Sequence, residues 1–236
     1  MTPVDVQTEG GPPPLRGDIA IVGMSCLFAG APDLDTYWRN IISKFDAVSD
    51  PPADEWDPKL FYDPESKSND RVYCKRGGYI GELSQFRPLD FGIMPVTVDG
   101  GEPDQWLALR LAQEALVDAG YAESPKERER TEVILGKGTY VNRGNLTVGY
   151  HCMLIEYFLQ VLRNLHPEYT ESEVGEIKQE LKGGLPPFSA DTAPALIGNI
   201  IAGRIANRMT SWGPVLRLTQ PAHQRFWRSR SEYAIF

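Results

Sequence analysis

The sequence predicts an α/β fold, and this prediction rests on two alternating hydrophobic patterns along the 236 residues of the chain. Short apolar runs rich in β-branched residues, at 18–24 and 131–135, are typical of buried strands. Segments with apolar residues at helical spacing follow these runs. The order strand, helix, strand, helix with short connections indicates the α/β class.

Residues 33–43 form the first predicted helix, because their large apolar side chains recur at helical spacing. The recurring side chains are those of Leu34, Tyr37, Trp38, Ile41 and Ile42. The next stretch, 46–64, is rich in proline and aspartate and therefore predicts a loop. Its aromatic residues, Trp56, Phe61 and Tyr62, are expected to pack onto the core.

A longer and mostly buried helix is predicted to begin near Pro103, since proline suits the first helical position, where its missing N–H would have no partner. Apolar residues cover most of its surface, and the polar stripe is narrow. This stripe consists of Arg110, Gln113, Glu114 and Asp118. Gly120 supplies the stop, and the strand at 131–135 then leads to Gly136.

Two apolar helices are predicted in the second half of the chain. The first covers 152–165 and ends at His166-Pro167, because a residue before proline disfavours helical geometry. The other covers 193–209 and precedes Ser211-Trp212-Gly213-Pro214.

A polar helix between these two is marked by its own end signals. Residues 170–173 (TESE) form a capping box, in which the Thr170 side chain accepts from first-turn amides while Glu173 reaches back. The helix is expected to run to Lys182 and to end at Gly183-Gly184.

The composition is that of a soluble globular protein, with 42% hydrophobic and 24% charged residues. A net charge of −8 without a basic stripe argues against nucleic acid and anionic membrane as partners. No stretch approaches the ~20 apolar residues of a membrane helix. Residues 1–17 lack the basic start and apolar middle of a signal peptide and are interpreted as a flexible lead or linker. Three widely spaced cysteines without a C-x-x-C pair argue against zinc and disulfides, so a cytoplasmic protein is expected.

Local patterns supply no catalytic constellation. Residues 136–138 (GKG) follow a predicted strand, but Val141 stands where a dinucleotide-binding loop needs its third glycine. His151 and Cys152 are adjacent and would point in different directions on a helix, so a buried cysteine beside an ordinary histidine is the favoured interpretation. Cys26 and Cys74 are interpreted as small core or loop residues. No catalytic, cofactor-binding or metal-binding residues are assigned from these patterns.

Two ordered motifs stand in the first half of the chain: residues 19–26 (IAIVGMSC), followed by Ala31-Pro32-Asp33 and Tyr37-Trp38, and residues 86–93 (FRPLDFGI). They resemble the amino-terminal half of the β-ketoacyl synthase (ketosynthase) domain of type I polyketide and polyunsaturated-fatty-acid synthases. The first is similar to the opening of that domain, and the second to the family's F-D-P-x-x-F-G-I segment, with Arg87 in place of the usual aspartate.

Two helical motifs extend the resemblance over residues 18–214, which we expect to be an incomplete ketosynthase amino-terminal domain. Residues 114–120 (EALVDAG) match the family's E-A-L-x-D-A-G helix, and 199–208 (NIIAGRIANR) resemble the helix that runs up to the active site. The insertion at 143–187 is most similar to that of polyunsaturated-fatty-acid and related iterative synthases.

The resemblance implies a thiolase-like fold with α-β-α-β-α layers, usually a homodimer. It also implies an acyltransferase that performs decarboxylative Claisen condensation of acyl and malonyl thioesters carried on acyl carrier protein. The nucleophile of this chemistry is a cysteine at a helix amino terminus, where the dipole favours the thiolate. Two histidines from the second half assist decarboxylation and stabilise the enolate oxygen. No cofactor is bound directly, because the phosphopantetheine belongs to the carrier protein.

The resemblance stops after Gly213-Pro214. The family continues approximately S-Y-T-V-D-A-A-C-A-S-S-L, whereas residues 215–226 read VLRLTQPAHQRF, so the nucleophile position falls at Ala222. The chain ends at Phe236, before the second half and its histidines. The tail, 215–236, is unusually basic: it carries Arg217, Arg225, Arg228 and Arg230 against Glu232.

A shifted reading frame is our hypothesis for this tail. New codons are formed when the third base of each codon, starting at Leu218, is joined to the first two bases of the next codon. With permitted codon choices these new codons encode D-A-A-C-A-S, and the cysteine codon spans Pro221 and Ala222. The alternative is an unrelated tail with a basic surface role.

The sequence therefore predicts a ketosynthase amino-terminal half, truncated before the nucleophile helix and inactive as given, with exposed apolar surface and a doubtful homodimer. A second hypothesis is a non-catalytic fragment that binds a carrier protein or a synthase subunit. A third is an enzyme that uses Cys152 or Cys26.

Overall fold

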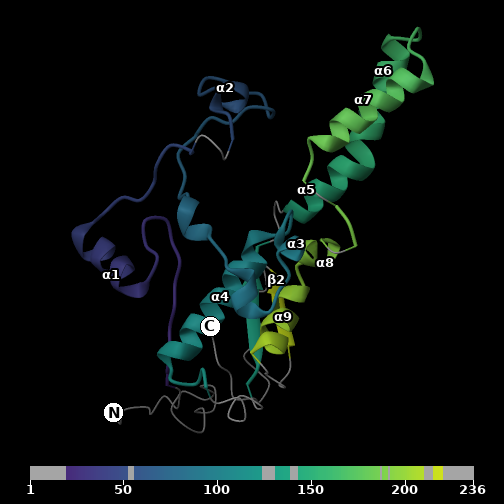
Figure 1. Ribbon diagram of the computed structural model, residues 1–236. Coiled ribbons are helices and arrows are strands. Elements are labelled where there is room, and N and C mark those ends of the chain that lie inside the picture. The colour runs from purple at the N-terminus through teal and green to yellow at the C-terminus, as the bar shows by residue number, and fades with distance from the viewer. Residues whose placement is uncertain are drawn as a thin grey trace, which may run out of the picture.

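A pair of parallel strands and the helices that pack on it form the centre of the molecule (Figure 1). The computed structural model describes residues 20–52, 56–123, 131–138, 143–186, 188–190, 192–209 and 215–219, with the backbone alone at 143–145 and 215–219. Strand β1 (Val133–Lys137) pairs with β2 (Val215–Thr219) in a register that sets Val133 opposite Val215 and Lys137 opposite Thr219. The strand predicted at 131–135 is thus confirmed, displaced by two residues.

Helix α4 (Pro103–Asp118) supplies most of the core, as its sequence predicts. Pro103 occupies the first turn, and Gly120 ends the helix in the left-handed conformation (φ 76°). One face of α4 is buried against α9 (Ile200–Arg208), which also packs on β1. The core residues that these three elements share are Trp106, Leu109, Ala112, Leu116, Val133, Ile201, Ala202, Ile205 and Ala206.

The helix predicted at 193–209 is two helices, and the single helix is therefore wrong. Helix α8 (Ala193–Leu196) ends at Ile197, whose backbone is extended (ψ 108°), and α9 starts three residues later. The buried Gln105 side chain supports the break by donating hydrogen bonds to the carbonyls of Ala195 (2.7 Å) and Ile197 (3.1 Å). These carbonyls also accept from the amides of Glu102 and Ile200, so Gln105 adds a second donor to each.

A helical arm extends away from the sheet (Figure 1). It begins with α5 (Arg143–Gly149), continues through a π-helical turn (Tyr150–Leu154) into α6 (Ile155–Leu165), and returns as α7 (Glu171–Gly183). The predicted helix at 152–165 is confirmed but starts inside the π-helical turn. The predicted capping box at Thr170 is confirmed in both of its hydrogen bonds.

The arm has a small core of its own and an exposed apolar face. Buried Ile155, Leu159 and Val174 hold α6 to α7, and ion pairs Glu156–Lys178 and Arg163–Glu171 cross the two helices at the surface. Another face of α6 is apolar and open to solvent. Its exposed residues include Tyr157, Phe158, Val161 and Leu165.

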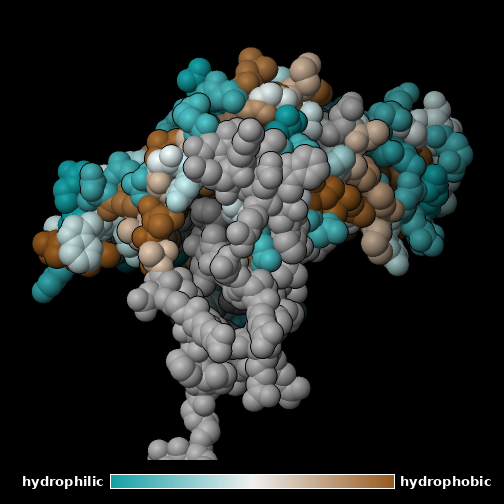
Figure 2. Space-filling model, turned by 90° about the horizontal axis from the view of Figure 1, so that it is seen from below, coloured by the Kyte–Doolittle hydropathy of each residue, from teal (hydrophilic) through white to brown (hydrophobic). Residues whose placement is uncertain are grey.

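The amino-terminal region contains short elements joined by loops: α1 (Leu34–Ser43), α2 (Pro58–Phe61), two 3₁₀ turns η1 (Gly81–Ser84) and η2 (Pro88–Phe91), and α3 (Pro95–Val98). The helix predicted at 33–43 is confirmed, and Asp33 caps it by accepting from the Thr36 amide at 2.7 Å. None of the residues of α1 is buried, and Trp38 is 62% exposed. Figure 2 shows apolar patches that interrupt the hydrophilic surface, one of them at the end of the molecule where α1 lies.

The buried strand predicted at 18–24 is wrong for the part that the structure describes, residues 20–24. This segment forms no strand or bridge, and Ile21 is 77% exposed. It lies along α4 instead, because the Met24 amide donates to the Asp118 carboxylate at 2.8 Å. Gly23 permits this contact, since a Cβ there would come 2.3 Å from the Ala115 carbonyl oxygen.

The loop aromatics behave differently from one another. Trp56 donates from Nε1 to the Tyr79 hydroxyl at 3.1 Å and is partly buried, whereas Phe61 is exposed, so its predicted packing onto the core is wrong. Within the described ranges, no helix has the length and apolar composition that crossing a bilayer requires.

Candidate functional site

The carboxyl ends of β1 and β2 form the edge where chemistry is expected. Ligand sites of open α/β sheets lie outside the carboxyl ends of the parallel strands. Lys137 and Thr219 are the last paired residues at this edge. Ala222, the position that the family resemblance assigns to the nucleophile, follows Thr219 closely in sequence and lies outside the described residues.

An ion pair between a buried lysine and a half-exposed carboxylate lies at this edge. The Lys137 ammonium lies 2.5 Å from the Asp104 carboxylate of the first turn of α4, and the two side chains are 7% and 44% exposed. Lys137 shares the buried face of β1 with Val133, because side chains alternate along a strand. Sequence reasoning noticed Lys137 only as part of a glycine motif and assigned it no partner.

The structure also decides against a dinucleotide-binding loop at 136–138. Gly136 and Lys137 belong to β1 itself rather than to a turn that follows it. The lysine side chain is turned into the pair with Asp104. Residues 136–137 are therefore the end of strand β1, and Lys137 is a buried cation there.

Gln105 organises the loop beneath this edge. It is fully buried, its Nε2 donates to carbonyls of Ala195 and Ile197, and its Oε1 accepts from Arg204 Nε at 3.3 Å. One amide side chain thereby ties α4, the α8–α9 break and α9 together. The hydrophobic pattern of α4 carries no signal for this role, since its partners are about 90 residues away.

Arg204, the partner of Gln105, also contacts a stack of aromatic rings. Arg204 lies over the Trp106 ring at 4.3 Å from its centroid, and Trp106, Phe86 and Phe91 are stacked at centroid distances of 5.7 and 4.9 Å. Burial, and secondly the nearby Arg208 charge, lowers the pKa of Arg204 from its usual value. The stack anchors η2 against the amino-terminal half of α4.

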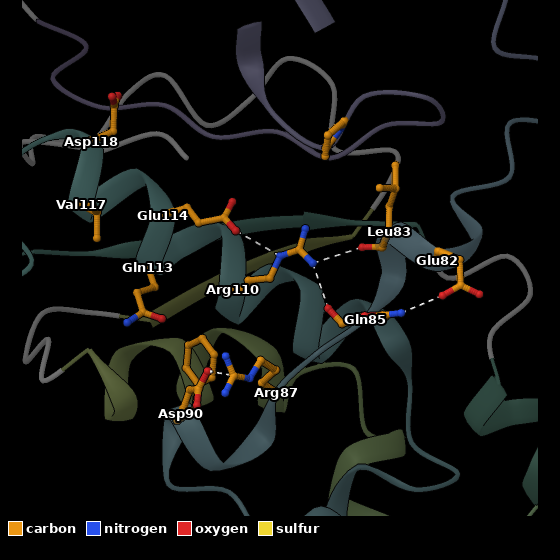
Figure 3. Close-up of a pocket in the computed structure, with 12 residues that line it drawn as sticks. Glu82, Leu83, Gln85, Arg87, Asp90, Arg110, Gln113, Glu114, Val117 and Asp118 are labelled. Atoms are coloured by element: carbon orange, nitrogen blue, oxygen red, sulfur yellow. Dashed lines mark hydrogen bonds and ion pairs between the residues drawn. The ribbon is translucent and has the colours of Figure 1, made fainter. Parts of the chain in front are cut away.

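A polar groove runs between α4 and the loop at 81–91 (Figure 3). Arg110 crosses it, donating to the carbonyls of Leu83 (3.1 Å) and Gln85 (2.9 Å) and pairing with Glu114 (3.1 Å). Arg87 and Asp90 form another ion pair at 3.3 Å on its wall. Arg110 and Arg87 thus both have hydrogen-bond or ion-pair partners within the groove. The bonds from Arg110 hold residues 81–91 on α4.

The cysteines do not form a Cys/His pair in the described part of the chain. Cys152 is exposed, which corrects the expectation that it is buried, and His151 Nε2 contacts the Pro186 carbonyl at 2.9 Å instead. Cys74 is exposed, and Cys26 is partly buried. Burial, with added repulsion from Asp33 and Glu114, raises the pKa of Cys26 and so disfavours its nucleophilic thiolate.

No group of three or more His, Cys, Asp and Glu side chains with metal-binding geometry occurs among the described residues. The geometry therefore leaves the strand-end edge as the candidate site, with Lys137 and Asp104 as its fixed polar groups.

Comparison with known proteins identifies where similar chains occur. A family model described as the amino-terminal domain of beta-ketoacyl synthase matches residues 16–219. Polyketide synthase PksN of Bacillus subtilis is 35% identical over 138 residues, which cover 58% of this chain and 2% of that protein. A polyunsaturated fatty acid synthase polypeptide of Thraustochytrium is 29% identical over 191 residues, which cover 80% of this chain and 6% of that protein.

Solved structures show the same fold. The oxazolomycin ketosynthase domain OzmH KS7 of Streptomyces albus superimposes with a TM-score of 0.61 at 23% identity, covering 85% of this chain and 29% of that chain. The module 6 ketosynthase of the Bacillus subtilis bacillaene synthase gives a TM-score of 0.53 at the same identity. The chain thus spans less than a third of these ketosynthase structures and a few per cent of the synthases.

Proposed function

Because this chain belongs to the β-ketoacyl synthase family, matching its amino-terminal domain over 16–219, we propose that its parent reaction is decarboxylative Claisen condensation. The resemblance seen in the sequence is confirmed at the level of the family and of the ketosynthase fold. The layered α-β-α-β-α order remains a prediction, since the described residues contain one pair of strands.

The observation that carries the proposal is the parallel pairing of β1 with β2. Thr219, the last paired residue of β2, ends at the carboxyl edge of the strand pair, and in open α/β sheets this edge is where ligand sites lie. The family match also extends through β2, so it includes residues 215–219 of the tail that we predicted to be aberrant.

The parent reaction has two balanced steps. A cysteine thiolate displaces the carrier thiol from an acyl thioester, and the new thioester keeps the acyl group on the enzyme. The malonyl thioester then loses carbon dioxide, its enolate carbon attacks the acyl carbonyl, and the cysteine thiolate leaves. Ala222 has no sulfur to perform the first step, so we infer that the chain as printed does not condense substrates.

The remaining assignments are proposals from the family. Acyl carrier protein would deliver both thioesters on its phosphopantetheine, with no cofactor bound directly by this chain. We also propose a cytoplasmic location, and we propose a homodimer for the complete domain of the family rather than for this chain.

A second candidate function is the binding of a carrier protein or a synthase subunit without catalysis. The exposed apolar face of α6 favours it, because large apolar patches rimmed by polar residues commonly mark protein interfaces. Retention of this chain by immobilised carrier protein, lost on Tyr157→Lys, would support it.

The test of the proposed function begins with the coding DNA from codon 209 to beyond codon 236. We expect an in-frame D-A-A-C after the codon for Arg217. Chains with and without this frame are then exposed to an acyl thioester of N-acetylcysteamine, and acylated peptides are identified by mass spectrometry.

The frame-restored chain should be acylated on its new cysteine, and the printed chain should show no more than the background labelling of exposed Cys74 and Cys152. Labelling of Cys26 or Cys152 well above that of Cys74, and equal in both chains, would contradict the proposal and favour the third hypothesis.

A further inference from the structure

Two arginines, Arg204 and Arg208, lie one helical turn apart on one side of α9. Within the described part of the chain neither forms an ion pair. Some other surface cations do have an acidic partner, as Arg87 has Asp90 and Lys75 has Asp50. The local positive charge stands out because the whole chain carries −8.

Arg204 is fixed in place by buried groups. Its guanidinium stacks on the Trp106 ring at 4.3 Å, and its Nε donates to Gln105 Oε1 at 3.3 Å. Trp106 and Gln105 are themselves buried. This single hydrogen bond, the only one that Arg204 makes among the described residues, leaves its two Nη groups available and held in one plane.

Arg208 lies beside Gly92, at the end of η2. A Cβ on Gly92 would come 3.4 Å from Arg208 Nη1, so the guanidinium lies at contact distance from this position. Gly92 follows Phe91, which stacks on Phe86 and through it on Trp106. Arg208 thus lies next to the end of η2 and is exposed.

Neighbouring like charges are unfavourable, and partial burial increases the cost. The lowered pKa of Arg204, caused by burial and then by Arg208, reflects this arrangement. An anion between the two guanidinium groups would offset the repulsion and satisfy the open donors.

We propose that Arg204 and Arg208 form a binding site for a phosphate group. Two planar forks one helical turn apart present several N–H donors, which match the several oxygens of phosphate better than the two of a carboxylate. The combined charge of +2 matches a phosphate monoester dianion, whereas a phosphodiester would leave one charge unbalanced.

Isothermal titration calorimetry of the full chain with inorganic phosphate tests the site, with acetate as the carboxylate probe. Dimethyl phosphate, a monoanion, distinguishes a diester source from a monoester. Arg208→Gln removes the exposed guanidinium, and Arg39→Gln is the matched control, since Arg39 is an exposed arginine on α1. Arg204→Lys keeps the charge but loses the planar fork.

We expect one saturable phosphate site, weakened at least about tenfold in Arg208→Gln and in Arg204→Lys and unchanged in Arg39→Gln. Phosphate should raise the melting temperature of the unaltered chain but not of Arg208→Gln. Without phosphate, Arg208→Gln should melt no lower than the unaltered chain, because it relieves a repulsion.

Three results would overturn the proposal: no saturable phosphate binding, equal binding by Arg208→Gln, or acetate binding as tightly as phosphate. Tight binding of dimethyl phosphate would support the site and assign it to a phosphodiester. None of these outcomes depends on acylation, so a failure of the phosphate site would leave the proposed function unaffected, and the reverse also holds.

Discussion

Lys137 Nζ lies 2.5 Å from Asp104 Oδ2 and joins the carboxyl end of β1 to the first turn of α4. The pair is asymmetric, because the lysine is almost wholly buried while the carboxylate is nearly half exposed. This contact adds a polar link between β1 and α4 to the apolar packing around Val133.

Removing the carboxylate should cost more than removing the cation. Asp104→Asn leaves a buried ammonium beside a neutral amide, and we expect a loss of about 1–3 kcal/mol in the free energy of unfolding. Lys137→Met replaces the cation by an apolar chain of similar length and should cost less. Urea denaturation of both variants measures the difference, and the reverse order would refute the account.

Gly23 should tolerate no side chain, because a Cβ would come 2.3 Å from the Ala115 carbonyl oxygen and 2.7 Å from the Ala119 Cβ. We expect Gly23→Ala to lower the free energy of unfolding by about 1–3 kcal/mol or to detach residues 20–25 from α4. Gly203→Ala is the control, since its Cβ would meet nothing within 4 Å and helix propensity should raise stability by about 0.5–1 kcal/mol. Thermal unfolding of the two variants should therefore shift in opposite directions.

Gln105→Leu should be among the most damaging substitutions in α4. It removes one of the donors to the Ala195 and Ile197 carbonyls and the acceptor for Arg204, for which we expect a loss of about 2–4 kcal/mol. Gln113→Leu, on the exposed side of the same helix, should change stability by less than about 0.5 kcal/mol. Equal effects in denaturant unfolding would show that the carbonyl contacts contribute nothing.

The α6–α7 arm should lose order in acid. A hydrogen bond from the Thr170 amide lowers the pKa of Glu173, and a side-chain bond from Lys178 lowers the pKa of Glu156. Because these pKa values are lower in the folded state, the stabilisation is present above the unfolded glutamate pKa of about 4.3 and is lost as pH falls through the folded values.

Amide hydrogen exchange in α7 between pH 6 and 3 measures this loss. Glu173→Gln retains a capping-box partner but cannot titrate, so its exchange should depend less on pH. An identical pH dependence in the variant would exclude the capping box as the cause.

Local signals in the sequence predicted the elements whose ends are set by neighbouring residues. Pro103 and Gly120 bound α4, and the Thr170–Glu173 box starts α7, because each acts within one turn. The family could be identified because its motifs are ordered segments of the sequence.

Features set by distant partners could not be predicted in this way. The break after Leu196 depends on Gln105, and the path of residues 20–24 depends on Asp118, both far away in sequence. The sequence motif at 136–138 includes Lys137, but the partner of Lys137 is Asp104, which belongs to α4. Hydrophobic periodicity reports which face is buried and not which polar groups meet there.

The parallel pairing of β1 with β2 also has a consequence for how the chain acquires its structure. The partner of Val133 is Val215, about 80 positions later, so the ribosome must add the whole helical arm before β1 gains its neighbour. At roughly 5–20 residues per second this delay is several seconds, during which one strand edge stays unpaired. The arm, whose contacts are local, can form in that interval, and the sheet is the last part to assemble.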